Sequence, residues 1–133
     1  MIFDSYKEET NKPLFRFSGE KNNYFKLNNS KRLSIRQYDI RNYNSGKHKT
    51  CDYILDIVTE GAYFIEIKGK KIEEAIEQLE STIQLVKNEL IPKKAFIIPT
   101  RNPYGTDTQN FKIKFHQKNN ALLIITSHCN ETV

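Results

Sequence analysis

The sequence predicts an α/β fold in which a central mixed β-sheet is flanked by helices, and three patterns carry this prediction. Residues 53–58 and 62–67 are rich in β-branched and aromatic residues and are separated by a short segment containing Gly61, as in a β-hairpin. Residues 71–90 repeat apolar side chains at helical spacing, and Pro92 ends this pattern. Residues 95–98 then form a continuous apolar run, which is typical of a buried parallel strand.

The segments before the hairpin are less regular. Phe15 and Phe17 alternate with polar residues, as in a short strand or an extended arm. Residues 33–40 alternate more clearly and are expected to be the first strand of the core sheet. Residues 41–50 are expected to form a turn with a basic tip.

Two strands are expected after the helix and the apolar run. Residues 99–110 form a long polar loop. In residues 111–116, Phe111, Ile113 and Phe115 alternate with two lysines and a histidine, which favours a strand with its cations outward. Residues 121–125 are expected to be the last strand.

Composition limits the class of protein. A chain of 133 residues with 38% hydrophobic residues can bury a core, and we expect one domain over residues 1–133. The formal net charge of +5 is consistent with a polyanionic partner. Cys51 and Cys129 lie far apart and lack metal-ligand spacing, which favours free thiols and a cytoplasmic location. No apolar stretch approaches membrane-spanning length, so no membrane partner is expected.

The loop of the hairpin decides which side chains share a face of the sheet. A two-residue loop and a three-residue loop differ by one residue in register, and this difference reverses the parity of the second strand. We favour a three-residue loop over residues 59–61, because Gly61 would then occupy the left-handed position that glycine tolerates best. Val58 would pair with Ala62.

In this register three charged residues converge. Asp52 would lie opposite Lys68, and Ile54 opposite Glu66, so that Asp52, Glu66 and Lys68 project from one face at one end of the hairpin. Two carboxylates on a half-buried sheet repel each other and lose hydration. A divalent cation removes the conflict, and Mg²⁺ is typically held by one or two carboxylates. Mn²⁺ is expected to substitute for Mg²⁺. The backbone carbonyl of Ile67 could supply a further ligand oxygen.

Asp52, followed after a hairpin by Glu66-Ile67-Lys68 and then a helix, resembles the PD-(D/E)xK nuclease superfamily. The resemblance covers the middle of the chain up to residue 79. It implies a restriction-endonuclease-like core, metal-dependent phosphodiester hydrolysis, Asp52 and Glu66 as metal ligands, and Lys68 as the catalytic lysine. It also implies that Gln78, on the following helix, supports the site. Cys51 stands where the motif's name has proline.

Further candidates lie outside this motif. Superfamily members often begin with a helix that donates an extra acidic ligand. Glu20 is the candidate here, with Glu8 and Glu9 as competitors, while an ordinary surface glutamate is the alternative. The candidate contacts to nucleic-acid phosphates are cations of the predicted loops and of the strand over residues 111–116, namely Lys47, Lys49, Arg101, Lys112 and Lys114.

We therefore expect a Mg²⁺-dependent endonuclease, with DNA as the favoured substrate. A catalytically silent module that binds nucleic acid or protein on the same fold remains an alternative, as does an RNA-cleaving toxin or defence effector. The chain is too small for a separate recognition domain, so a homodimer or a partner protein could supply specificity.

Overall fold

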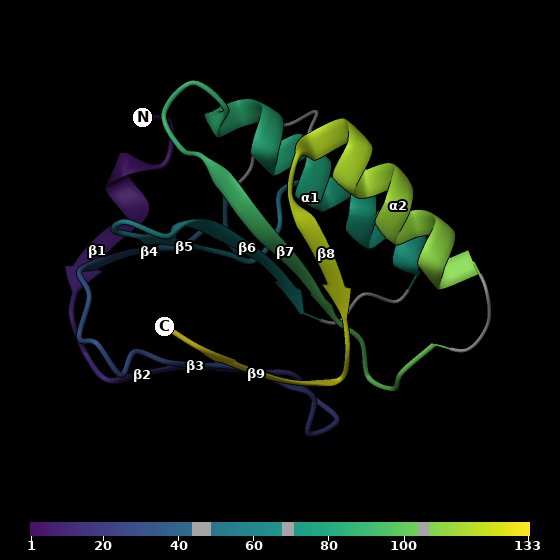
Figure 1. Cartoon of the computed structure of the whole chain (residues 1–133), viewed down its shortest axis with the longest axis horizontal. Coiled ribbons are helices and arrows are strands. Elements are labelled where there is room, and N and C mark those ends of the chain that lie inside the picture. Colours follow the sequence, from purple (N-terminus) through teal and green to yellow (C-terminus); the bar gives the residue numbers. More distant parts are fainter. Residues whose placement is uncertain (44–48, 68–70, 104–106) are drawn as a thin grey trace.

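The computed structural model describes residues 1–43, 49–67, 71–103 and 107–133. Its described elements form three layers (Figure 1): two helices, a six-stranded sheet beneath them and a three-stranded sheet beneath that. The six-stranded sheet contains β1 (Lys7–Thr10), β4 (Ile35–Asp39), β5 (Tyr53–Ile57), β6 (Gly61–Ile67), β7 (Pro92–Ile98) and β8 (Leu122–Ile125). The three-stranded sheet contains β2 (Leu14–Ser18), β3 (Tyr24–Asn28) and β9 (His128–Thr132), and the helices are α1 (Ile72–Val86) and α2 (Asp107–Asn119). A short 3₁₀ turn, η1 (Asp4–Tyr6), precedes β1.

The six-stranded sheet is mixed, as predicted. Its order is β1-β4-β5-β6-β7-β8. The neighbouring strands β1, β4, β5 and β6 pair antiparallel, and β6, β7 and β8 pair parallel. The apolar run at residues 95–98 therefore belongs to a buried parallel strand reached through α1. The predicted α/β fold with a mixed sheet is confirmed: α1 and α2 cover one face of this sheet, and the three-stranded sheet, which was not predicted, covers the other (Figure 1).

The sequence interpretation missed most of this second sheet. Phe15 and Phe17 lie in a strand, β2. Residues 33–40 contain β4, which is the second strand of the six-stranded sheet along the chain and not the first, because β1 precedes it. The side chains that β2 and β3 turn toward the six-stranded sheet are all buried, and they are Phe15, Phe17, Phe25 and Leu27. A single strand with such alternation cannot bury its apolar face alone. β2 buries this face by pairing with β3 and packing on the six-stranded sheet.

Residues 111–116 are helical, not extended. The segment falls within α2, where Phe111 and Phe115 lie one turn apart and pack on the core, and Asn119 continues that face. Ile113, expected to point inward, is 49% exposed. Apolar residues at positions 111, 113 and 115 fit a two-residue period, but positions 111 and 115 also fit a helix. Packing of the helix against β8 and α1 decides between them.

The hairpin register differs from the prediction by two residues. Ile57 lies opposite Gly61 and Ile54 lies opposite Phe64, so the predicted pairs of Val58 with Ala62 and of Ile54 with Glu66 are wrong. The loop is formed by residues 58–60 rather than 59–61. Because the shift is an even number, the parity of the two strands is preserved and the same side chains share a face.

Two residues in this loop region have positive φ. Thr59 has φ of 71° and Gly61, at the start of β6, has φ of 115°. A Cβ atom on Gly61 would lie 3.0 Å from the Cβ of Lys93 and 3.2 Å from the carbonyl oxygen of Ile91. Glycine is therefore required where β6 passes the start of β7.

We predict opposite effects of two substitutions here. Gly61→Val should destabilise the protein by about 1–3 kcal/mol, since it adds strain and a close contact. Thr59→Asn should stabilise it by up to about 1 kcal/mol, because asparagine tolerates positive φ better than a β-branched residue does. Urea unfolding measures both, with Glu60→Ala as a control expected to change stability by no more than about 0.5 kcal/mol. A Gly61→Val protein as stable as the parent would contradict this account of the loop.

Candidate functional site

Asp52 and Glu66 lie together at one end of the β5–β6 hairpin. Asp52 directly precedes β5, and its backbone N–H donates to the carbonyl oxygen of Ile65 at 3.0 Å. Its side chain turns toward β6, where Oδ2 accepts a hydrogen bond of 2.9 Å from the backbone N–H of Ile67. Because Glu66 directly precedes Ile67 in the chain, this bond fixes the carboxylate of Asp52 close to Glu66 at the end of β6.

Glu66 is a buried carboxyl group. It follows Phe64 by two residues, so the two side chains share a face of β6. Phe64 packs in the core cluster with Ala75 and Leu79 of α1, and the side chain of Glu66 therefore lies on the helix-covered side of the sheet. Only 6% of the residue is exposed. Among the residues that the structure describes, none donates a hydrogen bond to its Oε1 atom, which is also buried.

This environment disfavours the charged form of Glu66. Burial is the main cause that raises its pKa from an ordinary 4.5 to about 8, and the negative charge of Asp52 raises it further. A backbone hydrogen bond from Asp52 acts in the opposite direction with a smaller effect. Near neutral pH the pair therefore favours binding of one additional positive charge, either a proton or a cation.

The two carboxylates fit a magnesium site better than a site for a softer metal. Mg²⁺ prefers oxygen ligands and is usually held by one or two carboxylate side chains, while water or substrate fills the rest of its coordination shell. The buried Oε1 atom of Glu66, which has no donor in the described part of the chain, and the neighbouring carboxylate of Asp52 suit this pattern. No group of three or more His, Cys, Asp or Glu side chains suited to a metal occurs within residues 1–43, 49–67, 71–103 and 107–133. Asp52 and Glu66 are two carboxylates only, and their role as metal ligands stays a prediction. The carbonyl of Ile67 remains a predicted ligand.

The segment that carries Asp52 is anchored to α1. Thr82 Oγ1 accepts a hydrogen bond of 2.8 Å from the N–H of Cys51 and donates one of 2.7 Å to the carbonyl oxygen of Gln78. The side chain of Gln78 donates a longer bond, 3.5 Å, to the carbonyl oxygen of Thr50. Gln78 therefore contacts the backbone just before Asp52, and its role in supporting the site stays a prediction.

Cys51 has a packing role at this position. Its side chain is completely buried, and burial is the main cause of its raised pKa, so the thiol stays protonated. Both cysteines are free, as predicted. An apolar residue before Asp52 fills the core in the place where the motif's name has proline.

The structure describes only some of the other predicted residues. Lys68 and Lys47 lie outside the described residues. Lys49 is exposed in the segment that leads to Asp52. Arg101 is exposed shortly after β7, whose last residue, Ile98, pairs with Ile67, so this loop leaves the sheet at the end where Glu66 lies.

Lys112 and Lys114 do not form the expected row. Both belong to α2, and residues two apart on a helix point to different sides, whereas the prediction placed them together on one strand face. Lys114 is exposed and Lys112 is partly buried. A continuous contact of both lysines with one phosphate backbone is therefore disfavoured.

Glu20 lies in another layer. It is exposed in the turn between β2 and β3, on the side of the six-stranded sheet opposite to α1. The initial helix expected to carry an acidic ligand is replaced by η1 and β-strands. Glu66, in contrast, faces the helices. The turn nevertheless reaches the end of β7, where Asn23 donates a hydrogen bond of 2.9 Å to the carbonyl oxygen of Ile98, and the role of Glu20 stays a prediction.

Arg41 was missed as a candidate. Its guanidinium donates two hydrogen bonds to the carboxylate of Asp39, at 2.9 and 2.7 Å, and lies 5.1 Å from the ring centre of Tyr53. These bonds are the main cause of its raised pKa, and the charge of Asp52 makes a smaller contribution. An exposed cation is thus held beside Asp52. The Asp-x-Arg spacing at the end of a predicted strand was the available signal.

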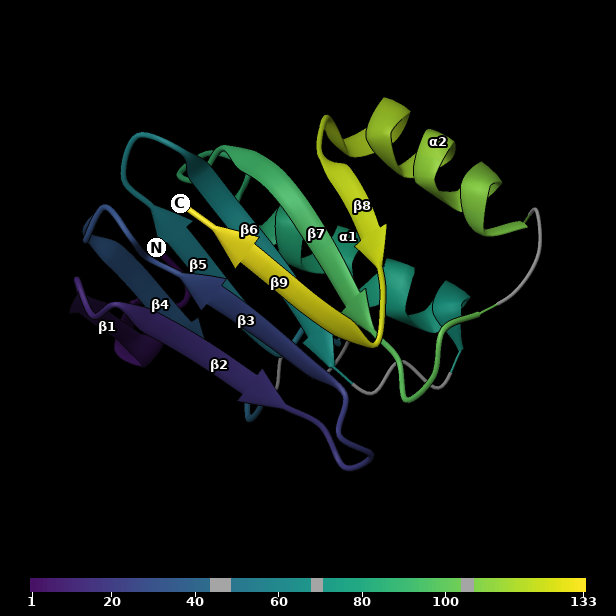
Figure 2. The ribbon, with the colours of Figure 1, turned by 60° about the horizontal axis from the view of Figure 1, so that its bottom comes forward.

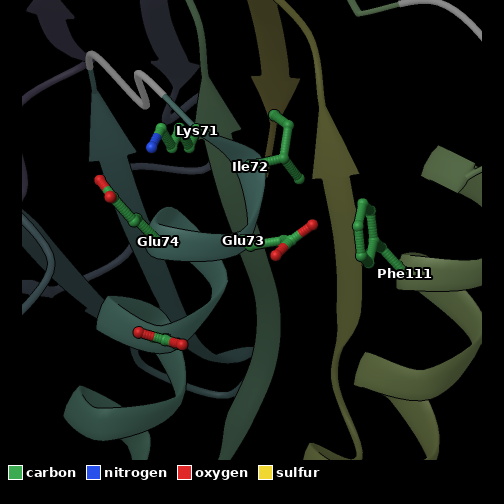
Figure 3. Close-up of a pocket in the computed structure, with 6 residues that line it drawn as sticks. Lys71, Ile72, Glu73, Glu74 and Phe111 are labelled. Atoms are coloured by element: carbon green, nitrogen blue, oxygen red, sulfur yellow. The ribbon is translucent and has the colours of Figure 1, made fainter.

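A shallow groove opens at the first turn of α1, next to α2 (Figure 3). It encloses about 350 Å³ and is lined by Lys71, Ile72, Glu73, Glu74, Glu77 and Phe111. Three carboxylates against one ammonium make it unfavourable for a phosphate group. Glu73 and Glu74 instead stabilise the positive end of the helix dipole, and the groove contains neither Asp52 nor Glu66.

Comparisons with protein-family models, with curated proteins and with solved structures find no match for this chain. The resemblance to PD-(D/E)xK nucleases therefore rests on the residues of the chain itself. No helix in the described ranges is long and apolar enough to cross a membrane.

We predict that Glu66 makes the metal-free protein less stable as the pH rises. The folded protein keeps the Glu66 proton up to about pH 8, whereas the unfolded chain releases it near 4.5, so between these values the folded state binds more protons. Stability should fall by on the order of 3 kcal/mol from about pH 5 to about pH 8. Urea unfolding in EDTA at a series of pH values measures this slope.

Glu66→Gln should remove that part of the slope, because glutamine does not titrate. Glu60→Gln, at the other end of the same hairpin, should leave it unchanged. Parallel pH curves for the parent and Glu66→Gln proteins would show that Glu66 is ionised in the folded state at neutral pH.

We also predict that Thr82 holds the Asp52 segment in place. Thr82→Val keeps the shape of the side chain but leaves the buried N–H of Cys51 without its acceptor, at a cost of about 1–3 kcal/mol. Thr82→Ser keeps the hydroxyl group and serves as the matched control. Urea unfolding and amide hydrogen exchange at Cys51 measure the effect. Slow exchange at Cys51 in Thr82→Val, equal to that in Thr82→Ser, would contradict it.

Proposed function

We propose that this protein is a Mg²⁺-dependent endonuclease that hydrolyses phosphodiester bonds, with DNA as the favoured substrate. The observation that carries the proposal is the pairing of Asp52 with the buried Glu66 at the end of β6. Glu66 has its Oε1 atom without a donor in the described part of the chain. Such a pair is unfavourable as a purely structural feature, because burial and the charge of Asp52 both raise the pKa of Glu66.

An ordinary surface carboxylate would explain Glu66 less well. Glu66 is far less exposed than such a carboxylate, which would normally remain hydrated. A divalent cation satisfies both carboxylates at once.

Each residue has a defined part in the proposed reaction. Asp52, oriented by the N–H of Ile67, and Glu66 hold the cation. A bound Mg²⁺ supplies Lewis-acid polarisation of the phosphate and activation of water. Lys68 is the predicted catalytic lysine, which neutralises charge on the phosphate under attack or takes up a proton. Gln78 and Thr82 are positioning residues, because they act through the backbone of residues 50 and 51.

The surroundings of the pair offer cations for a phosphate backbone. Arg41 is held beside Asp52, Lys49 lies in the segment before it, and Arg101 lies in the loop after β7. All three are exposed. They favour a polyanionic substrate, and they contain no feature that separates DNA from RNA.

We predict that Asp52 and Glu66 are both required for metal binding and for cleavage. Asp52→Asn and Glu66→Gln should weaken Mn²⁺ binding, measured by calorimetry without substrate, by at least about tenfold, because even groups that only orient ligands contribute ~10–100-fold. Asp52→Ala, Glu66→Ala and Lys68→Ala should abolish cleavage of a panel of DNA and RNA substrates with Mg²⁺ or Mn²⁺, as EDTA should for the parent protein.

Glu60→Gln is the control, and it should retain both metal binding and cleavage. Metal binding without cleavage of any substrate would favour the catalytically silent alternative. Equal Mn²⁺ affinity of the parent and Glu66→Gln proteins would exclude the proposed site, and cleavage of RNA alone would replace DNA by RNA as the substrate.

A further inference from the structure

The outer face of the three-stranded sheet is an open, polar surface on the far side of the six-stranded sheet from α1 (Figure 2). In each of its strands buried and exposed residues alternate, with Phe15, Phe25 and Cys129 among those turned inward. The residues that point outward form a set that we call the outer face: Leu14, Arg16, Ser18, Tyr24, Lys26, Asn28, His128, Asn130 and Thr132.

The outer face carries cations but no carboxylate. Arg16 and Lys26 lie directly opposite each other on β2 and β3, and His128 adds a third basic group on β9. The one acidic residue in these strands, Glu131, alternates with the outward positions, and its carboxylate bonds Lys94 of β7 at 2.7 Å between the two sheets. In a chain with 16 acidic residues, a face of nine side chains without one favours an anionic partner.

Flat side chains cross this face in a row. The guanidinium of Arg16 lies 4.9 Å from the ring centre of Tyr24, and the rings of Tyr24 and His128 are 5.2 Å apart with an angle of 37° between their planes. Asn130 donates a hydrogen bond of 3.3 Å to the hydroxyl group of Tyr24. Neighbouring strands thus hold the rings in defined positions, which reduces the entropy lost when a ligand stacks on them.

This combination suits single-stranded nucleic acid better than a duplex. Unpaired bases stack on aromatic rings whatever their sequence, while cations beside the rings contact the phosphates. The bases of a duplex are already stacked on one another, and a broad sheet cannot enter a groove to reach them. An acidic peptide would use the cations but not the ring pair.

We propose that the outer face binds single-stranded nucleic acid, with Arg16 and Lys26 contacting phosphates and the Tyr24–His128 ring pair stacking on bases. This surface is separate from Asp52 and Glu66, and its binding does not depend on the proposed cleavage. The face nevertheless lies near the end of the sheet where those carboxylates lie. The N–H of Ser127, just before β9, donates at 2.7 Å to Asn102 in the loop that carries Arg101.

The first test is binding of fluorescent oligo(dT) and oligo(U), measured by anisotropy in EDTA at several salt concentrations, with a DNA duplex in parallel. Arg16→Ala/Lys26→Ala should weaken binding of the single strands by about tenfold or more. The slope of log affinity against log salt should fall by about 0.7 for each phosphate contact, or about 1.4 for both.

The matched control is Lys7→Ala/Lys87→Ala. It removes the same charge from β1 and from the end of α1, away from the outer face. If affinity depends on direct contacts at the outer face and not on net charge, this control should change affinity by no more than about twofold. Arg16→Gln/Lys26→Gln repeats the test with most of each side chain retained, in case truncation lowers the melting temperature.

The second test separates stacking from charge. Tyr24→Ala/His128→Ala should lower the affinity for a single strand by about fivefold or more, with little change in salt slope, because base stacking is sequence-tolerant and not ionic. An abasic oligonucleotide should bind the parent protein as weakly as the normal oligonucleotide binds this variant, and the variant should not distinguish the two strands.

Three results would overturn the proposal. These are an equal loss of affinity in the Lys7→Ala/Lys87→Ala control, tighter binding of the duplex than of the single strand, or competition by polyglutamate as effective as that by oligonucleotide. Loss of cleavage with intact single-strand binding, as expected for Glu66→Gln, would leave the proposal standing, so the two sites fail independently.

Discussion

The structure depends on one constraint, which is that β6 is covered on both faces. Ala62 and Phe64 pack under α1, and Tyr63, Ile65 and Ile67 pack against the three-stranded sheet, so every residue from Ala62 to Ile67 is buried. A strand in this position normally reads as a continuous apolar run. Glu66 is the exception. Its carboxyl group enters the core because the backbone alternation leaves it nowhere else to point.

The burial of Glu66 makes Asp52 important. In water two neighbouring carboxylates would interact weakly, but in a buried site their repulsion is much larger. The protein nevertheless fixes them side by side, through the N–H of Ile67 to Asp52 and through Thr82 to Cys51. The same contacts that hold β5, β6 and α1 together thus keep the two carboxyl groups adjacent. A buried carboxyl group with a strongly raised pKa often belongs to a functional site, and this is the role that we propose for the pair.

The net charge of the chain is distributed unevenly. Glutamates gather at the first turn of α1, where they favour the helix dipole and line a groove that would repel phosphates. The outer face of the three-stranded sheet carries Arg16 and Lys26 without an opposing carboxylate. We therefore expect a polyanion to approach the three-stranded sheet rather than the groove at the first turn of α1.

The sequence by itself determined the elements whose hydrophobic pattern fits only one type of secondary structure. The period of residues 72–86 is helical and no other, and the apolar run of β7 after it requires a parallel partner. It also determined that the two carboxylates would meet. The parity of β5 and β6 survives an error of two residues in the loop, since side chains repeat with the same period along a strand.

The tertiary structure decided what local pattern left open. Residues 111–116 fit both a strand and a helix, and only contact with β8 and α1 made them helical. Phe15 and Phe17 gave no sign of β3, which pairs with β2, or of β9, which pairs with β3 and lies about a hundred residues later in the chain. The raised pKa of Glu66 likewise required the packing of α1 on the sheet, because burial is a property of the assembled layers and not of a Glu-x-Lys spacing.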